Sequence, residues 1–222
     1  MTLRILCYGD SLTAGSPGSD GLLTPYGPHL ELALRRLLDI QVTVRHVGLS
    51  GWKASELREG ADSAPTGLRH LLEQWANGSA SGPIDAAILL AGTNDLGSAS
   101  SERDVAPHVI ALHRIAHSVG VRTIAVGVPQ SGYTDASAAM EATRLASNRR
   151  IEAWCKASTR CTYVECPIAW DGGGALWEPG DGLHFSSRGY AALGKRLAEP
   201  VARALGRGDQ FVWDDPRFSD HL

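Results

Sequence analysis

The chain has 222 residues, of which 43% are hydrophobic and 20% are charged, with a formal net charge of −3. These values are typical of an ordinary globular protein that is long enough to bury a full core in one domain. No segment is dense in Lys and Arg, and no apolar stretch approaches the roughly 20 residues of a membrane span, so neither a nucleic-acid partner nor a membrane span is expected.

Short apolar runs alternate with helical patterns along the chain. Almost fully apolar runs predict five strands, at residues 3–8, 42–47, 86–91, 123–128 and 162–165. Apolar residues at steps of three and four predict five helices, at residues 26–38, 67–76, 102–119, 138–157 and 187–205. Such strands between helices predict an α/β three-layer sandwich around a parallel sheet, and we expect the flavodoxin-like strand order 2-1-3-4-5.

The two ends of the chain predict its domain bounds and its localisation. We expect one domain over residues 1–205 and a separate tail over 206–222, which contains three aromatic residues. Because exposed aromatics would be unusual, the tail is expected to dock on its own domain or on a neighbouring subunit of a homo-oligomer. The first strand begins at Leu3. This leaves no room for a signal peptide and favours a cytoplasmic protein, with a trimmed secreted protein left open.

Cysteines and histidines give no clear metal pattern. The four cysteines form no CxxC pair; Cys155 and Cys161 could bridge in an oxidising compartment, although reduced thiols are favoured. His113 and His117 lie four residues apart, as metal ligands can, but no HExxH pattern includes them. We therefore expect no metal and no cofactor.

Polar and glycine-rich segments follow the predicted strands. Gly9-Asp10-Ser11-Leu12 follows the first strand, Gly48-Leu49-Ser50-Gly51 the second and Gly92-Thr93-Asn94-Asp95 the third, while Asp181-Gly182-Leu183-His184 lies in a loop after the fifth. The carboxyl ends of parallel strands share one edge of a sheet, where α/β folds bind their ligands. These segments are therefore expected to meet at that edge.

The residue types in these segments suit acyl transfer. A serine hydroxyl becomes a nucleophile only with a base in reach, and the base needs an orienting partner. Ser11 would attack an acyl carbonyl, His184 would take its proton, and Asp181 would orient the imidazole. The negative charge that develops on the carbonyl oxygen needs preset donors. The backbone N–H groups of Ser11 and Gly51 and the side-chain amide of Asn94 would supply them.

Together the four segments resemble the sequence blocks of the GDSL/SGNH hydrolase family, in the family's order and over residues 9–184. The resemblance implies a Ser-His-Asp triad and an oxyanion hole at the positions already named: Ser11, His184, Asp181, Gly51 and Asn94. One position departs from the pattern. The family often has an asparagine five residues before the second-block glycine, where this chain has His46. That difference puts a supporting turn in doubt rather than the chemistry.

The resemblance also implies a carboxylic ester hydrolase that acts on a small-molecule ester. Esterase, lipase, thioesterase, lysophospholipase and sugar-acetyl esterase activities all remain open, as does acyl transfer to an alcohol. Without a long segment to serve as a lid, short-chain acyl, acetyl or aryl esters and acetylated sugars are favoured. Trp52, Trp177 and Pro129 are the candidate substrate-binding residues, with residues 129–134 as a pocket wall and 16–24 as a rim loop.

Two other classes of function were weighed. A small-ligand-binding module could hold a phosphate at residues 9–15, but the segment lacks both G-x-G-x-x-G and a Walker lysine. That interpretation also leaves Asp181 and His184 unexplained. An α/β-hydrolase would carry its serine in G-x-S-x-G, which this chain does not contain.

Overall fold

The computed structural model describes residues 2–15, 21–77, 82–98 and 104–207. Within them a five-stranded sheet has the order β2-β1-β3-β4-β5, and every neighbouring pair of strands is parallel. The predicted fold class and strand order are therefore confirmed. The strands are β1 (Thr2–Gly9), β2 (Gln41–Gly48), β3 (Ala86–Leu90), β4 (Arg122–Val126) and β5 (Cys161–Val164).

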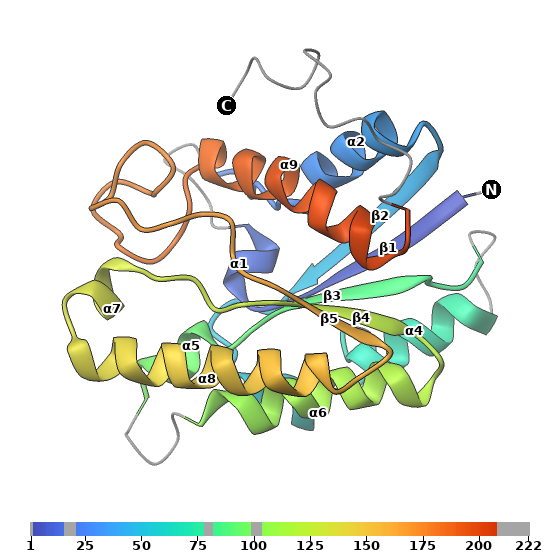
Figure 1. Cartoon of the computed structure of the whole chain (residues 1–222), viewed down its shortest axis with the longest axis horizontal. Helices are drawn as coiled ribbons and strands as arrows, with labels where there is room; N and C mark the ends of the chain where they lie inside the picture. The colour runs from blue at the N-terminus through green and yellow to red at the C-terminus, as the bar shows by residue number, and fades with distance from the viewer. Residues whose placement is uncertain (1, 16–20, 78–81, 99–103, 208–222) are drawn as a thin grey trace.

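Helices cover both faces of this sheet (Figure 1). One face carries α2 (Gly27–Leu38) and α9 (Ser187–Ala204), which pack against each other. The opposite face carries α3 (Ala54–Glu59), α4 (Leu68–Asn77), α6 (Val105–Ser118) and α8 (Ala138–Lys156). The result is the three-layer arrangement that the alternating sequence pattern predicts.

Strand β1 shows why the sheet is apolar on both sides. Leu6 and Tyr8 point into the core under α4 and α6, while Ile5 and Cys7 point into the core under α2 and α9. Successive side chains of a strand alternate between the faces. A central strand with helices on both faces must therefore be apolar at nearly every position.

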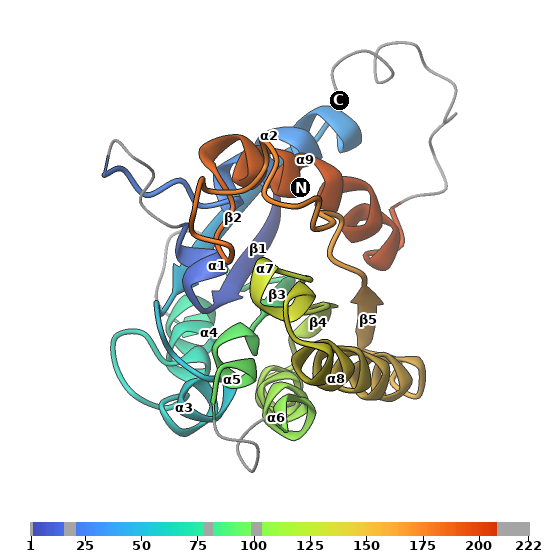
Figure 2. The ribbon, with the colours of Figure 1, turned by 90° about the vertical axis from the view of Figure 1, so that its left-hand side faces the viewer.

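Four helices were not predicted from the sequence. One is α3, which has six residues; the other three are α1 (Ser11–Ala14), α5 (Thr93–Leu96) and α7 (Gly132–Asp135). Each of these three has four residues, too few to show a helical period, and each lies close after the carboxyl end of a strand. Figure 2 looks at this end of the sheet, where α1, α5, α7 and the orange segment before α9 gather.

The remaining differences concern the ends of helices and the tail. Helix α6 begins at Val105, and residues 102 and 103 of the predicted helix lie outside the described residues. Helix α9 continues through Pro200 to Ala204. The aromatic residues of the tail also lie outside the described residues, so its docking stays a prediction. No helix in the described part of the chain is long and apolar enough to cross a membrane.

Candidate active site

The segment that contains Ser11 lies directly after the central strand β1. Ser11 is the first residue of α1, and Asp10 caps this helix through a carboxylate oxygen that accepts the N–H of Leu12 at 3.0 Å. The chain turns tightly here, because a Cβ on Gly9 would collide with the carbonyl oxygen of Leu90 in β3. Ser11 itself is 6% exposed. Its position is therefore fixed by the close contact of two central strands.

The segment that contains His184 is a loop closed on itself between β5 and α9. Trp177 and Phe185 form an antiparallel bridge at its base. Next to that bridge the N–H of Glu178 donates to the carbonyl oxygen of His184 at 2.9 Å. Residues 177–185 are thus held by backbone hydrogen bonds, and the imidazole has a defined place on a rigid loop.

Ser11, His184 and Asp181 form one continuous chain of polar contacts. Ser11 Oγ lies 3.0 Å from His184 Nε2, and His184 Nδ1 lies 3.1 Å from both carboxylate oxygens of Asp181. Burial by itself raises the pKa of Asp181, but hydrogen bonds from the His184 backbone and ring and from the Leu183 N–H outweigh it and lower that pKa. The carboxylate therefore stays ionised beside the imidazole, and three side chains separated by up to 173 residues meet as expected.

Three candidate hydrogen-bond donors follow strands β1, β2 and β3 at the edge of the sheet that holds Ser11. Among the described residues, no acceptor takes the backbone N–H of Ser11 or of Gly51. The Asn94 amide nitrogen donates to the carbonyl oxygen of Trp52 at 2.9 Å, which orients the group and leaves its second N–H available. Gly51 has φ +81°, a conformation that favours glycine, and a Cβ there would meet nothing within 4 Å. The arrangement suits stabilisation of an oxyanion.

His46 does not disturb the turn that carries Gly51. It lies within β2 and packs against Gly27 at the start of α2. The turn itself is closed by a hydrogen bond from the Trp52 N–H to the Leu49 carbonyl oxygen at 3.1 Å. The departure from the family pattern is therefore accommodated in the strand.

Two carboxyl groups are buried beneath the serine. Asp10 and Asp95 are both 0% exposed. Complete burial raises the pKa of Asp10 to about 6; the hydrogen bond from the Leu12 N–H opposes this rise, and the neighbouring Asp95 adds to it. Burial also raises the pKa of Asp95, although one of its oxygens accepts the N–H of Ala54 at 2.9 Å. These groups support the loops and have no access to a substrate.

Trp177 does not line the site, contrary to the sequence-based prediction. It is 1% exposed, and its indole N–H donates to the carbonyl oxygen of Ala169 at 3.2 Å. Its ring packs between Trp170 and Phe185, with ring centroids 4.8 Å and 4.7 Å apart. The residue supports the His184 loop from below, and its prediction as a substrate contact is wrong.

The other candidate pocket residues differ in how much of each side chain is exposed. Pro129 is buried, and its role as a substrate contact stays a prediction. Trp52 is 38% exposed and its role stays a prediction. Tyr133, in the expected wall segment 129–134, was not singled out, yet it is 55% exposed and lies beside Gly182 of the His184 loop. Only the packing of neighbouring elements distinguishes these residues, and no local sequence signal does.

The four cysteines are buried, and among the described histidines only His113 is buried. His113 is buried with its Nδ1 3.8 Å from Cys161 Sγ, and His117 Nε2 lies 2.9 Å from Thr123 Oγ1. Cys155 and Cys161 are free thiols, as are the other two cysteines. Across residues 2–15, 21–77, 82–98 and 104–207, no three His, Cys, Asp or Glu side chains meet as a metal site would require.

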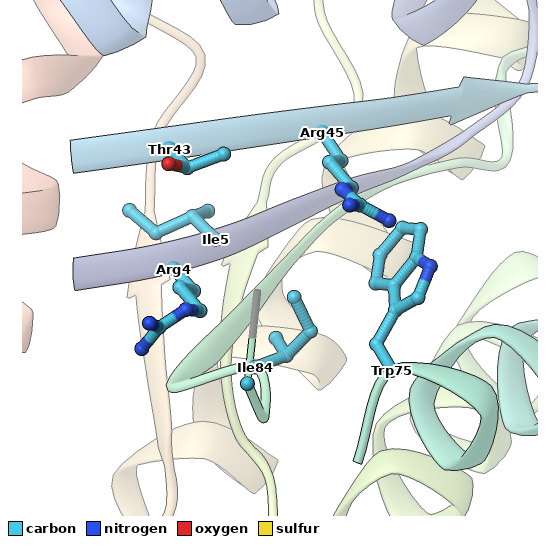
Figure 3. Close-up of a pocket in the computed structure, with 7 residues that line it drawn as sticks. Arg4, Ile5, Thr43, Arg45, Trp75 and Ile84 are labelled. Carbon is cyan, nitrogen blue, oxygen red and sulfur yellow. The ribbon is translucent and has the colours of Figure 1, made fainter. Parts of the chain in front are cut away.

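A small cavity lies away from this edge of the sheet (Figure 3). Its volume is about 10 Å³, enough for about one water molecule. Arg4 on its wall is seven residues before Ser11 along an extended strand, about 20 Å away. The cavity therefore has no part in the chemistry of Ser11. The residues that line it are Arg4, Ile5, Thr43, Arg45, Trp75, Gly82 and Ile84.

Comparison with known proteins identifies the family and agrees with the fold. The model of the GDSL-like lipase/acylhydrolase family matches residues 7–192. No curated protein matches the sequence. Solved structures with the same fold include Est24, a carbohydrate acetylesterase from Sinorhizobium meliloti, at 21% identity and TM-score 0.65, covering 90% of this chain and 99% of that one. An inhibitor-bound aryl esterase from M. smegmatis is 22% identical with TM-score 0.64 (91% and 99% covered). A family 3 carbohydrate esterase from Clostridium thermocellum is 19% identical with TM-score 0.69 (92% and 99% covered).

Proposed function

The chain belongs to the GDSL-like lipase/acylhydrolase family, and on that premise we propose that it is a serine esterase whose nucleophile is Ser11. The observation that carries the proposal is the unbroken contact chain from Ser11 Oγ through the imidazole of His184 to the carboxylate of Asp181. A hydroxyl paired with an oriented base is what nucleophilic catalysis on an acyl group requires.

The proposed reaction proceeds through an acyl-enzyme. With the imidazole proton on Nδ1 and directed at Asp181, His184 Nε2 accepts the Ser11 hydroxyl proton as Oγ attacks the ester carbonyl carbon. The tetrahedral intermediate collapses when Nε2 returns that proton to the departing alkoxide, which leaves as the alcohol. Water then attacks the acyl-serine by the same proton route and releases the carboxylic acid. Asp181 stabilises the imidazolium in both halves of the reaction.

The donors around Ser11 support this mechanism. The N–H groups of Ser11 and Gly51 and the second amide N–H of Asn94 would bind the carbonyl oxygen as it becomes negative. Such donors are fixed before the reaction, so they need no reorganisation in the transition state. The hydrogen bond from Asn94 to the Trp52 carbonyl limits rotation of the amide.

Short acyl groups are the proposed substrates, as acetyl or other short-chain esters of alcohols, aryl alcohols or sugars. Structures similar to this chain include carbohydrate acetylesterases and an aryl esterase, which supports this range. The described residues contain no separate lid domain over Ser11. A long acyl chain would therefore find little apolar surface to cover it, which makes lysophospholipids the weaker candidates.

The decisive test compares Ser11→Ala with the wild type on 4-nitrophenyl acetate. We expect the rate to fall by at least about 10³-fold, because the oxyanion donors remain while the nucleophile is lost. Ser118→Ala, at the exposed end of α6, is the matched control and should keep the wild-type rate. Circular dichroism checks that both variants fold.

A serine-reactive fluorophosphonate separates an enzyme from a binding module. The proposal expects one covalent adduct, located at Ser11 by peptide mass spectrometry and absent from Ser11→Ala. Retention of most of the esterase rate in that variant, or an adduct elsewhere, would refute the assignment. Adding a primary alcohol to the assay and measuring the new ester shows how the acyl-enzyme divides between water and alcohol.

A further inference from the structure

We propose that Tyr133 binds the alcohol half of the ester and gives the enzyme a preference for alcohols that carry a ring. This inference rests on the proposed esterase function and adds a specificity-determining residue to it. Three observations support it: the exposure of Tyr133, the hydrogen bonds that hold its backbone, and its position beside the loop that carries His184.

The side chain of Tyr133 is more exposed than tyrosine side chains usually are. With 55% of its surface exposed, it is one of the most exposed large apolar residues in the described chain. No described residue forms a hydrogen bond with its hydroxyl. A single exposed aromatic needs no explanation by itself, but this one lies beside the loop that carries His184.

The backbone around Tyr133 is held on both sides. Ser131 and Thr134 cap α7 reciprocally, through an N–H to Oγ1 bond of 2.9 Å and an N–H to Oγ bond of 3.4 Å. Gly132 donates its N–H to the carbonyl oxygen of Gly182 at 2.8 Å. Because these hydrogen bonds hold the backbone of Tyr133 in place before a ligand binds, less conformational entropy is lost on binding.

The ring lies against the loop of the proposed general base. A Cβ added to Gly182 would lie 3.8 Å from Tyr133 Cε2, and Gly182 stands between Asp181 and His184 in that loop. A Cβ on Gly132 would meet Trp170 at 2.9 Å and the Gly182 carbonyl oxygen at 3.2 Å. Glycine at 132 thus allows α7 to approach the loop closely enough to bring Tyr133 beside it.

The chemistry of acyl transfer decides which half of the ester Tyr133 meets. The carbonyl oxygen must face the donors on Gly51 and Asn94, which follow β2 and β3. The leaving oxygen must face His184 Nε2, which returns the proton to it. Tyr133 follows β4 and lies against the His184 loop. It is therefore on the side of the leaving alcohol, whereas Trp52, adjacent to Gly51, is on the side of the oxyanion.

An alcohol that carries a ring suits this surface best. A tyrosine ring packs on another ring in preferred geometries that a flexible chain cannot adopt. Such a ring pair contributes about 0.5–1.5 kcal/mol to binding beyond the burial of apolar area. The substrates predicted to benefit are esters of aryl or benzyl alcohols, in comparison with esters of linear alcohols of similar reactivity.

The test compares benzyl acetate with butyl acetate, two esters with one acyl group and leaving alcohols of similar acidity. For Tyr133→Ala we expect kcat/KM on benzyl acetate to fall about tenfold, while kcat/KM on butyl acetate changes by less than about twofold. Tyr133→Phe keeps the ring and should retain the wild-type ratio of the two substrates. Leu32→Ala, which removes an equally exposed apolar side chain from α2, is the matched control.

The outcomes separate this inference from the esterase proposal. Equal losses on both esters in Tyr133→Ala, or no loss on either, would overturn the role of the ring in selectivity. Tyr133→Leu provides a second variant, with a side chain of intermediate size. If its ratio of kcat/KM on benzyl acetate to kcat/KM on butyl acetate equals that of the wild type, the role of the ring in selectivity is also overturned. A wild-type protein inert toward both acetates and toward 4-nitrophenyl acetate would refute the esterase proposal itself, and this inference with it.

Discussion

Replacing Asp10 with asparagine should stabilise the protein at neutral pH. The carboxyl is fully buried, one of its oxygens accepts the N–H of Leu12 and the other has no hydrogen-bond partner among the described residues. Asparagine caps a helix as well as aspartate does, so Asp10→Asn keeps the contact with Leu12. The variant removes the buried charge, and its NH₂ group takes the place of the oxygen that has no partner.

The magnitude follows from the pKa of Asp10, which burial raises from 3.8 to about 6. The native state then keeps a proton at pH values where the unfolded chain has lost it. The contribution of Asp10 to stability is therefore fully present below pH 3.8 and is lost as the pH rises through about 6. About two pKa units correspond to about 3 kcal/mol. The advantage of Asp10→Asn should grow from about 0.5 kcal/mol at pH 4 to about 3 kcal/mol at pH 8.

Thermal or urea unfolding followed by circular dichroism between pH 4 and pH 8 measures this difference. For a chain of this length, about 3 kcal/mol corresponds to a rise in Tm of roughly 6–12 °C at pH 8. A difference in stability that does not change with pH would show that the pKa of this carboxyl is not raised in the native state. A variant less stable than the wild type at pH 8 would show that the charge is favourable where it lies, and either result would refute the reasoning.

Two further predictions concern the proposed machinery. Asn94→Ala should lower kcat by about 10²–10³-fold with little change in KM, because the amide acts on the oxyanion rather than on the bound ester. Steady-state kinetics on 4-nitrophenyl acetate measure both constants. An effect confined to KM would assign Asn94 to substrate binding. Asp181→Asn should lower kcat by about 10⁴-fold, because the amide favours the wrong tautomer of the His184 imidazole. A loss below tenfold in the same assay would exclude the proposed role of Asp181 in orienting that imidazole. Since the pKa of Asp181 is lowered in the native state, its contribution to stability is present above the ordinary aspartate pKa and is lost as the pH falls. The difference in unfolding free energy between the wild type and Asp181→Asn should therefore shrink on acidification.

The sequence alone determined the layers of the fold and the residues that meet at its edge. Apolar period is a local property, so the runs at 3–8 and 86–91 indicated buried strands without knowledge of their neighbours. Once the strands are parallel, their carboxyl ends share one edge. The contact between Ser11 and His184 follows from that topology, and the structure places the two side chains within 3.0 Å.

Only the tertiary structure decided which aromatic residues face solvent. Nothing in the local sequence separates Trp177 from Tyr133. Trp177 is enclosed by Trp170 and Phe185, whereas Tyr133 stands on the four-residue helix α7 with 55% of its surface exposed. Exposure of a side chain depends on segments far along the chain that pack over it. The same non-local packing encloses the carboxyl of Asp10 and raises its pKa.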